Sequence, residues 1–136
     1  MIQQPWEITG ISNLMQSIEG CGKGYICEVI KAITGDENFY QSGNAETDVF
    51  DRFSNALRFR ILININDSKA QTNYDYHDLI KHIITAPTII YEEKEKQLIG
   101  IKNCVRLLFI TNNDFAMPFS DDERRFGDFF WMFIKM

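Results

Sequence analysis

The sequence lacks the features that mark secreted and membrane-spanning proteins. Its 136 residues hold three cysteines, at 21, 27 and 104, an odd number without the close spacing of a metal site. This count argues against a disulfide framework and favours reduced thiols in a cytosol-like compartment. The longest apolar runs, FFWMFI and VRLLFI, are far shorter than the roughly 20 residues of a membrane-spanning helix. The first ten residues also lack the charged start and apolar middle of a signal peptide.

Excess positive charge is lacking as well, since the net charge is −5 and the pI about 5.0. A protein that binds nucleic acid over its whole surface is usually basic, so any such contact is expected to be local or to need assembly. What is abundant is apolar: hydrophobic residues make up 45% and aromatic residues 13% of the chain. This composition favours one packed domain over residues 1–136 and argues against disorder.

Apolar periodicity predicts an alternation of strands and helices. Ile26, Ile30 and Ile33 lie at helical spacing, and Gly35 follows as a stop signal. Pro87 ends a second helical pattern. The expected elements are a short strand at 11–18, a helix at 23–34, a strand at 58–66, a helix at 74–85, a hairpin at 88–101, a strand at 104–111 and a last strand at 129–135. The alternation predicts an α/β layered fold with a mostly parallel sheet.

The stretch SIEGCGKGYICEVIKAITG, residues 17–35, is similar to a phosphate-binding loop. Such a loop directs backbone N–H groups at the start of a helix towards phosphates, and a lysine reaches the β and γ phosphates. Gly20, Gly22 and Lys23 fit this pattern. Ser17 stands where a glycine is usual, and Gly24 stands where a Ser or Thr hydroxyl would bind Mg²⁺. Phosphate binding and an ordinary glycine-rich turn are both compatible with the residues, and Cys21 is expected to be a small filler.

Two expected strands end in polar residues. Asn66 and Asp67 follow ILINI, and Asn112 and Asn113 follow LLFIT. An acid at a strand end can help to hold Mg²⁺, and an amide there can orient water or touch a phosphate. Asn64 alternates with apolar neighbours and is expected on the same face as Asn66. Polar residues that simply open a turn explain both strand ends equally well.

The segment SDDERRF, residues 120–126, adds charged residues near the end of the chain. Ser120 and Glu123 form a capping box for a short helical turn. Arg124 and Arg125 follow, and an arginine beside a nucleotide site can stabilise transition-state charge on a neighbouring subunit. A solvated charged turn is the alternative.

Taken together, these motifs resemble the core of superfamily 3 helicases, and most closely the helicase part of phage and large-DNA-virus primase-helicases. The order is a Gly-Lys loop, a strand ending in an acid, a hairpin with a charged tip, a strand ending in Asn, and then Arg. The most specific stretch is FITNNDFAMPFSDDERRF, and the loop form Gly-x-Gly-Lys-Gly is similar to a variant in these viral proteins. The resemblance covers roughly residues 11–134.

The resemblance implies an AAA+-like P-loop NTPase core, with helices on both faces of the sheet, a β-hairpin, and truncation at both ends. It implies ATP and Mg²⁺ as cofactors, with Asp67 as the remaining acid and metal ligand. Asn113 would be the sensor, with Asn112 as the alternative. Arg125 would be the arginine finger, with Arg124 as the alternative. The implied cofactor-binding residues are Gly20, Cys21, Gly22, Lys23, Gly24 and Tyr25.

The resemblance also implies partners and a location. The hairpin 88–101 would contact single-stranded DNA through Lys94 and Lys96, although glutamates share its tip. The chain would form a homo-oligomer or associate with other helicase subunits, without a membrane partner. It would act in the cytoplasm of a host cell or at a viral replication site.

Three functions follow as hypotheses, because Ser17, Gly24 and Asn66 depart from the family pattern. The chain could be the ATP-binding core of a replicative helicase, with slow or assembly-dependent hydrolysis. It could be a degenerate, non-catalytic helicase relative that binds a helicase, DNA or another replication protein. It could also be an α/β relic without nucleotide affinity.

Overall fold

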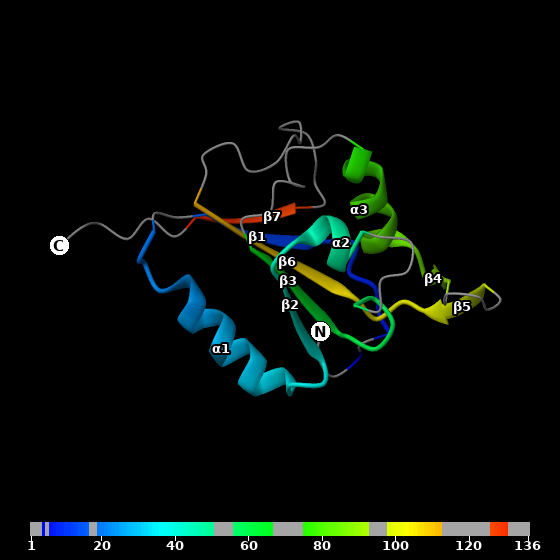
Figure 1. The fold of residues 1–136 in the computed structure, drawn as a ribbon, viewed down its shortest axis with the longest axis horizontal. Helices are drawn as coiled ribbons and strands as arrows, with labels where there is room; N and C mark the ends of the chain where they lie inside the picture. Colours follow the sequence, from blue (N-terminus) through cyan, green and yellow to red (C-terminus); the bar gives the residue numbers. More distant parts are fainter. Residues whose placement is uncertain are drawn as a thin grey trace.

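The computed structural model describes residues 4, 6–16, 19–50, 56–66, 75–92, 98–112 and 126–130. Helices and strands alternate along these segments (Figure 1). The elements are β1 (Ser12–Gln16), α1 (Lys23–Thr34), β2 (Phe39–Ser42), α2 (Ala45–Asp48), β3 (Leu62–Asn66), α3 (Asp75–Thr85), β4 (Thr88–Tyr91), β5 (Ile99–Lys102), β6 (Arg106–Thr111) and β7 (Phe126–Phe130). None of the helices in these segments is long and apolar enough to cross a membrane.

Five strands form one parallel sheet in the order β2-β3-β6-β1-β7. The register places Gln16 of β1 beside Thr111 of β6, and Asn66 of β3 beside Ile110. The carboxyl ends of β1, β3 and β6 therefore meet at one edge of the sheet. The predicted α/β fold with a mostly parallel sheet is confirmed.

Side chains alternate between the two faces of the sheet, as the pleat of a strand requires. On one face, Ile63, Ile65 and Phe109 pack with residues of α3 and with Ala45 and Val49 in and after α2. On the other face, Met15, Leu108 and Ile110 pack with Cys27, Ile26 and Ile30 of α1. Figure 1 shows α1 on one side of the sheet and α2 and α3 on the other. The expected helices on both faces are confirmed.

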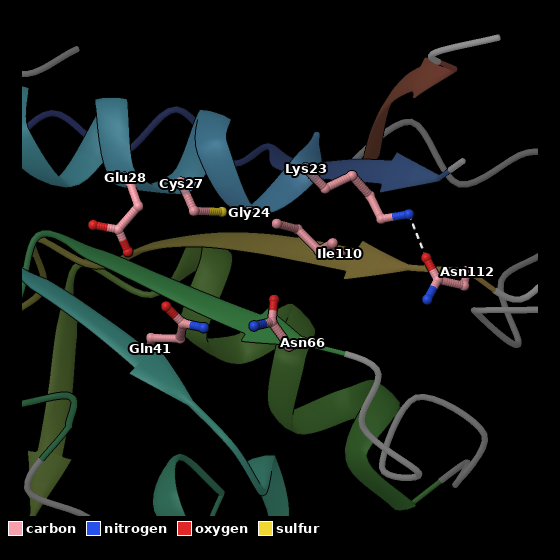
Figure 2. Close-up of a pocket in the computed structure, with 8 residues that line it drawn as sticks. All are labelled: Lys23, Gly24, Cys27, Glu28, Gln41, Asn66, Ile110 and Asn112. Carbon is pink, nitrogen blue, oxygen red and sulfur yellow. Dashed lines mark hydrogen bonds between the residues drawn. The ribbon is translucent and has the colours of Figure 1, made fainter. Parts of the chain in front are cut away.

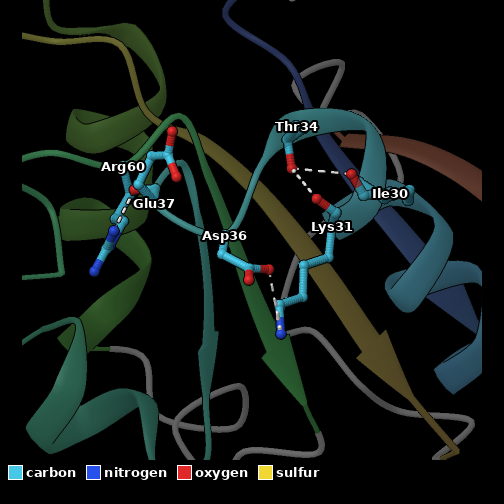
Figure 3. Close-up of polar contacts among 6 residues, drawn as sticks. All are labelled: Ile30, Lys31, Thr34, Asp36, Glu37 and Arg60. Carbon is cyan, nitrogen blue, oxygen red and sulfur yellow. Dashed lines mark hydrogen bonds and ion pairs between the residues drawn. The ribbon is translucent and has the colours of Figure 1, made fainter.

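The C-terminal end of α1 is held by local polar contacts (Figure 3). Gly35 adopts φ 87°, and its N–H donates to the carbonyl of Lys31 at 2.9 Å. Lys31 forms an ion pair with Asp36 at 3.6 Å. Further along, the Arg60 guanidinium donates to the carbonyl of Glu37 just before β2. The stop signal at Gly35 is therefore confirmed, because a left-handed φ is easy for glycine alone.

The predicted hairpin exists as the antiparallel pair β4-β5, in which Ile89 lies opposite Ile101. Its tip at residues 93–97 lies outside the described residues. Asn103, directly after β5, is buried and donates to the carbonyls of Ile83 and Ala86 at 2.6 and 2.7 Å. These bonds satisfy carbonyls at the end of α3 and anchor the hairpin to that helix.

Three expectations about the elements are corrected. The elements β2 and α2 were not predicted, because four residues each are too few to display a period. The last strand begins at Phe126 rather than at 129, since pairing with β1 begins at Ser12 opposite Phe126, and residues 131–135 of the predicted strand lie outside the described residues. Ile33 is 67% exposed, because the buried face of α1 is centred on Cys27 and Ile30 and Ile33 lies at its margin.

Candidate functional site

A pocket of about 250 Å³ lies between α1 and the carboxyl ends of the sheet strands (Figure 2). It sits at the edge where open α/β sheets bind ligands. Its lining residues are Lys23, Gly24, Cys27, Glu28, Gln41, Asn66, Ile110 and Asn112.

The loop before α1 is built on two glycines in the left-handed region. Gly20 has φ 80° and Gly22 has φ 93°, a conformation that strains any residue with a Cβ atom. Gly22 is the N-cap of α1 and offers no side-chain cap, and the first turn carries no acidic residue. The positive end of the helix dipole is therefore not neutralised by a carboxylate in the first turn.

Lys23 occupies the first position of α1 and crosses the mouth of the pocket. Its ammonium donates to Oδ1 of Asn112, the residue that follows β6. Figure 2 shows this side chain extending from the start of α1 to the end of the central strand. The ammonium of Lys23, at the start of α1, thus contacts the amide of Asn112 at the sheet edge, and both residues line the same pocket.

The base of the pocket is a small polar network on the α1 face of the sheet. Asn64 is fully buried, and its Nδ2 donates to Sγ of Cys27 at 3.3 Å and to Oδ1 of Asn66 at 3.1 Å. The bond confirms that Asn64 and Asn66 share one face. Because Asn66 accepts through its oxygen, its amide nitrogen remains to donate towards the pocket. The Oδ1 atom of Asn64 is buried without a hydrogen-bond partner in the structure.

Burial raises the pKa of the Cys27 thiol, and the neighbouring Glu28 carboxylate raises it further. The thiol is therefore neutral at physiological pH and serves as a weak partner for Asn64 rather than as a nucleophile. Cys21, in the glycine loop, is half-buried, and all three cysteines are free. The expected absence of a disulfide framework is consistent with this arrangement.

Only some of the predicted binding residues lie at the pocket in the structure. Lys23 and Gly24 line the pocket, and Gly20, Cys21 and Gly22 form the loop beside it. Tyr25 is 76% exposed and is not among the lining residues. The remaining predicted residues lie outside the described ones: Asp67, Asn113, Arg125, the alternative Arg124, Lys94 and Lys96. Their roles stay predictions, while Asn112 is the strand-end amide that the structure brings to Lys23.

Sequence reasoning missed four lining residues. Gln41 belongs to β2, which was too short to be recognised, and Ile110 was assigned to the strand core alone. Cys27 and Glu28 follow Lys23 on α1, and their helical positions could have placed them on the sheet side of the helix. Within the described segments, no group of three or more His, Cys, Asp or Glu side chains could hold a metal ion.

Comparison with known proteins relates the chain to phage DNA replication proteins. Residues 15–125 match DUF5906, a family of unknown function. The DNA primase-polymerase of Nitratiruptor phage NrS-1 is 23% identical over 129 residues, which cover 93% of this chain and 18% of that protein. The chain is homologous to that protein and spans less than a fifth of its length.

Solved structures of the C-terminal region of NrS-1 share this fold. An apo structure of region 305–718 aligns with a TM-score of 0.77 at 20% identity, covering 95% of this chain and 33% of that chain. An A form apo structure of the same region aligns with a TM-score of 0.75 at 20% identity, over the same shares. At this identity the likeness establishes the fold alone.

These comparisons correct the predicted function. A replicative helicase core, active or degenerate, is contradicted because the related phage protein is a DNA primase-polymerase. The physical reason for the error is that a Gly-Lys loop and an amide at a strand end indicate phosphate chemistry at a sheet edge, which is not specific to unwinding. The residues that would have marked a helicase, Arg125, Lys94 and Lys96, lie outside the described ones.

The family model covers most of the chain, and its span includes the loop, α1, and every residue that lines the pocket. The chain therefore belongs to DUF5906, a family of unknown function.

Proposed function

We propose that residues 1–136 form one domain with a P-loop-type core, which binds the phosphate groups of a nucleoside triphosphate within a phage-type DNA replication protein. Unwinding and translocation are not part of this function. The relevant setting is the cytoplasm of an infected host, where replication proteins meet nucleotides and DNA.

The observation that carries the proposal is the position of Lys23. It stands at the start of α1, directly after the left-handed Gly22, and its ammonium already engages an amide oxygen of Asn112 across the pocket. A phosphate oxygen is a stronger acceptor for this ammonium than the neutral amide oxygen of Asn112, because it carries negative charge and adds a Coulomb attraction between opposite charges. A phosphate that enters the pocket would therefore take this ammonium from Asn112 or share it.

Other groups in the pocket support an anionic ligand. The positive end of the helix dipole of α1 is directed at the loop. Asn66 lines the pocket, and because its oxygen accepts from Asn64, its amide nitrogen is the group that can donate to a ligand. The loop follows β1, which lies between β6 and β7 and is therefore not an edge strand. The relation to a primase-polymerase supports a nucleotide as the source of the phosphate.

The described pocket does not fit a protein-held Mg²⁺ ion. Mg²⁺ needs oxygen ligands in near-octahedral geometry, and Glu28 is the one carboxylate among the described lining residues. Gly24 supplies no hydroxyl where phosphate-binding loops usually place one. Asp67 follows the lining residue Asn66 in the sequence, and we propose it as the acid that would accompany a metal-bound nucleotide at this edge of the sheet.

Calorimetric titration of tripolyphosphate and of ATP into the wild-type protein tests the proposal. We expect dissociation constants in the range of about 10–100 µM, typical of a few charge-assisted contacts. Lys23→Ala should weaken both ligands by about tenfold or more, because it removes the cation at the loop. Mg²⁺ neutralises part of the charge of both ligands in solution, so it should not raise either affinity if the protein itself supplies no metal ligand.

Lys31→Ala is the matched control, since Lys31 lies on the same helix but pairs with Asp36 at its far end. This variant should bind like the wild type. Equal binding by Lys23→Ala and wild type, or no binding by the wild type, would remove the basis of the proposal.

A further inference from the structure

The pocket has two chemically opposite ends. At one end, the ammonium of Lys23 and the N-terminus of α1 favour anions. At the other, Glu28 contributes a carboxylate, which accepts hydrogen bonds and repels phosphate. Figure 2 shows Lys23 directed towards Asn112, while Glu28 is directed towards the side of the pocket where Gln41 lies. A ligand that satisfies both ends needs an anionic group and a separate group of hydrogen-bond donors.

The spacing along α1 sets the distance between these groups. Lys23 and Glu28 are separated by five helical positions, which correspond to a rise of about 7.5 Å between their backbone positions along the axis. The Lys23 side chain extends away from Glu28 towards Asn112 (Figure 2), so the two charged groups are not brought closer by their side chains. This length is of the order that separates the phosphate chain of a nucleotide from its ribose hydroxyls. It is too long for one inorganic phosphate to bridge.

Glu28 is available for such a contact. It is exposed at the pocket, and within the described residues it forms no hydrogen bond or ion pair. Lys31, the cation one helical turn further along, pairs with Asp36 instead. Figure 2 shows the Glu28 side chain extending from α1 towards the sheet strands, on the pocket side of the helix.

A carboxylate recognises a vicinal diol well, because its two oxygens accept one hydrogen bond from each hydroxyl. Acidic side chains use this chemistry to bind ribose hydroxyls in dinucleotide-binding folds. A 2′-deoxyribose offers only one of the two donors. The neutral amides of Gln41 and Asn66, which also line the pocket, supply further hydrogen-bond partners for the sugar. They are not expected to distinguish ribose from 2′-deoxyribose.

We propose that Glu28 is a specificity-determining residue that makes the pocket prefer a ribonucleoside triphosphate over its 2′-deoxy counterpart. The phosphates lie at Lys23 and the loop, and the 2′- and 3′-hydroxyls donate to the Glu28 carboxylate. This inference rests on the proposed function, because it needs phosphates bound at Lys23. It adds a selection for the sugar that phosphate binding alone does not require.

The test measures three ligands on the full chain: ATP, dATP and tripolyphosphate. Wild type should bind ATP about fivefold more tightly than dATP, the factor expected for one additional hydrogen bond of ordinary strength at an exposed carboxylate. Glu28→Gln should bind the two nucleotides with nearly equal affinity. It should bind tripolyphosphate roughly threefold more tightly than the wild type does, because a nearby negative charge is removed. Glu37→Gln removes the same charge outside the pocket and should retain the wild-type preference.

The outcomes separate this inference from the proposed function. If tripolyphosphate binding depends on Lys23 but wild type binds ATP and dATP equally, the role of Glu28 is wrong and the phosphate site stands. The same holds if Glu28→Gln keeps the preference for ATP. If wild type binds no tripolyphosphate, the phosphate site fails and the sugar selection fails with it.

Discussion

The two faces of the sheet differ in what they bury. The α2/α3 face packs a large apolar cluster that includes Phe109, Ile63 and Ile83, each almost completely buried. The α1 face has a smaller cluster, and it also buries the polar side chain of Asn64. Residues on the outer side of α1, such as Tyr25 and Val29, remain exposed. The comparison indicates that the α2/α3 face mainly stabilises the fold, whereas the α1 face carries the candidate site.

Apolar burial contributes most of the stability of a small domain, at roughly 1.5–3 kcal/mol for each large side chain. The α2/α3 face therefore contributes most of the free energy of folding. The α1 face carries the glycine loop, the cation and the amides, and it keeps a polar group without a full set of hydrogen bonds. Such local departures from optimal packing are typical of functional sites.

The largest effect is expected on the α2/α3 face. Phe109→Ala should lower the free energy of unfolding by about 3–5 kcal/mol, because it leaves a cavity in the centre of the larger cluster. Urea denaturation followed by circular dichroism measures this change. A loss below about 1 kcal/mol would mean that the α2/α3 face does not dominate stability.

The glycine loop should respond through backbone strain. Gly22→Ala should cost about 1–3 kcal/mol, because Gly22 has φ 93° while no atom within 4 Å would meet the new Cβ. Gly24→Ala is the matched variant: Gly24 is helical and also has open space around it, so alanine should stabilise α1 by up to about 1 kcal/mol. Thermal unfolding should show a lower melting temperature for Gly22→Ala and a higher one for Gly24→Ala than for the wild type. Equal changes in melting temperature for the two variants would contradict the left-handed conformation of Gly22.

Asp48 should give a smaller effect that depends on pH. The backbone N–H of Asn44, followed by the hydroxyls of Ser42 and Thr47, lowers the pKa of this carboxyl below its ordinary value of 3.8. The stabilisation is thus present above pH 3.8 and is lost as the pH falls through the lower, folded-state pKa. Asp48→Ala should cost about 1 kcal/mol at pH 7. The difference from wild type should shrink in acid unfolding measurements, and a constant difference down to pH 2 would contradict this.

The smallest stability effect is expected at Asn64 on the α1 face. Asn64→Leu should leave stability within about 1 kcal/mol of wild type or raise it, because an under-satisfied buried amide is replaced by an apolar side chain of similar volume. Tripolyphosphate binding should nevertheless weaken, since Asn66 loses the bond that orients its amide. Chemical denaturation measures the stability of this variant, and calorimetry measures its affinity for tripolyphosphate. A large loss of stability without a change in binding would mean that Asn64 stabilises the fold and does not orient Asn66.

Much of the fold could be predicted from the sequence. The helix from Lys23 to Thr34 and the strand ending at Thr111 follow from apolar periodicity and from the glycine stop, and both signals are local. The four-residue β2 and α2 could not be predicted, because their stability comes from pairing with β3 and from packing on the sheet rather than from their own sequence.

The site was predictable in part. The Gly-Lys loop pointed to Lys23, and the strand end pointed to Asn112 as the alternative sensor, while the contact between the two residues emerged only from the structure. The helical position of Glu28 could have placed it on the same side of α1 as Gly24, but Gln41 could not be assigned to this pocket without knowing the order of the strands. The helicase function was wrong because a Gly-Lys loop and a strand-end amide are not specific to unwinding, and the related phage protein is a DNA primase-polymerase.

The most direct test of the account is an amide chemical-shift titration of the ¹⁵N-labelled chain with tripolyphosphate, observed by NMR. The account predicts that shifts concentrate at Gly20, Gly22, Lys23 and Gly24, which form the loop and the start of α1. The amides of α3, on the opposite face, should not move. Shifts centred on α3 or on the β4-β5 hairpin, or no shifts at millimolar ligand, would contradict a phosphate site on the α1 face.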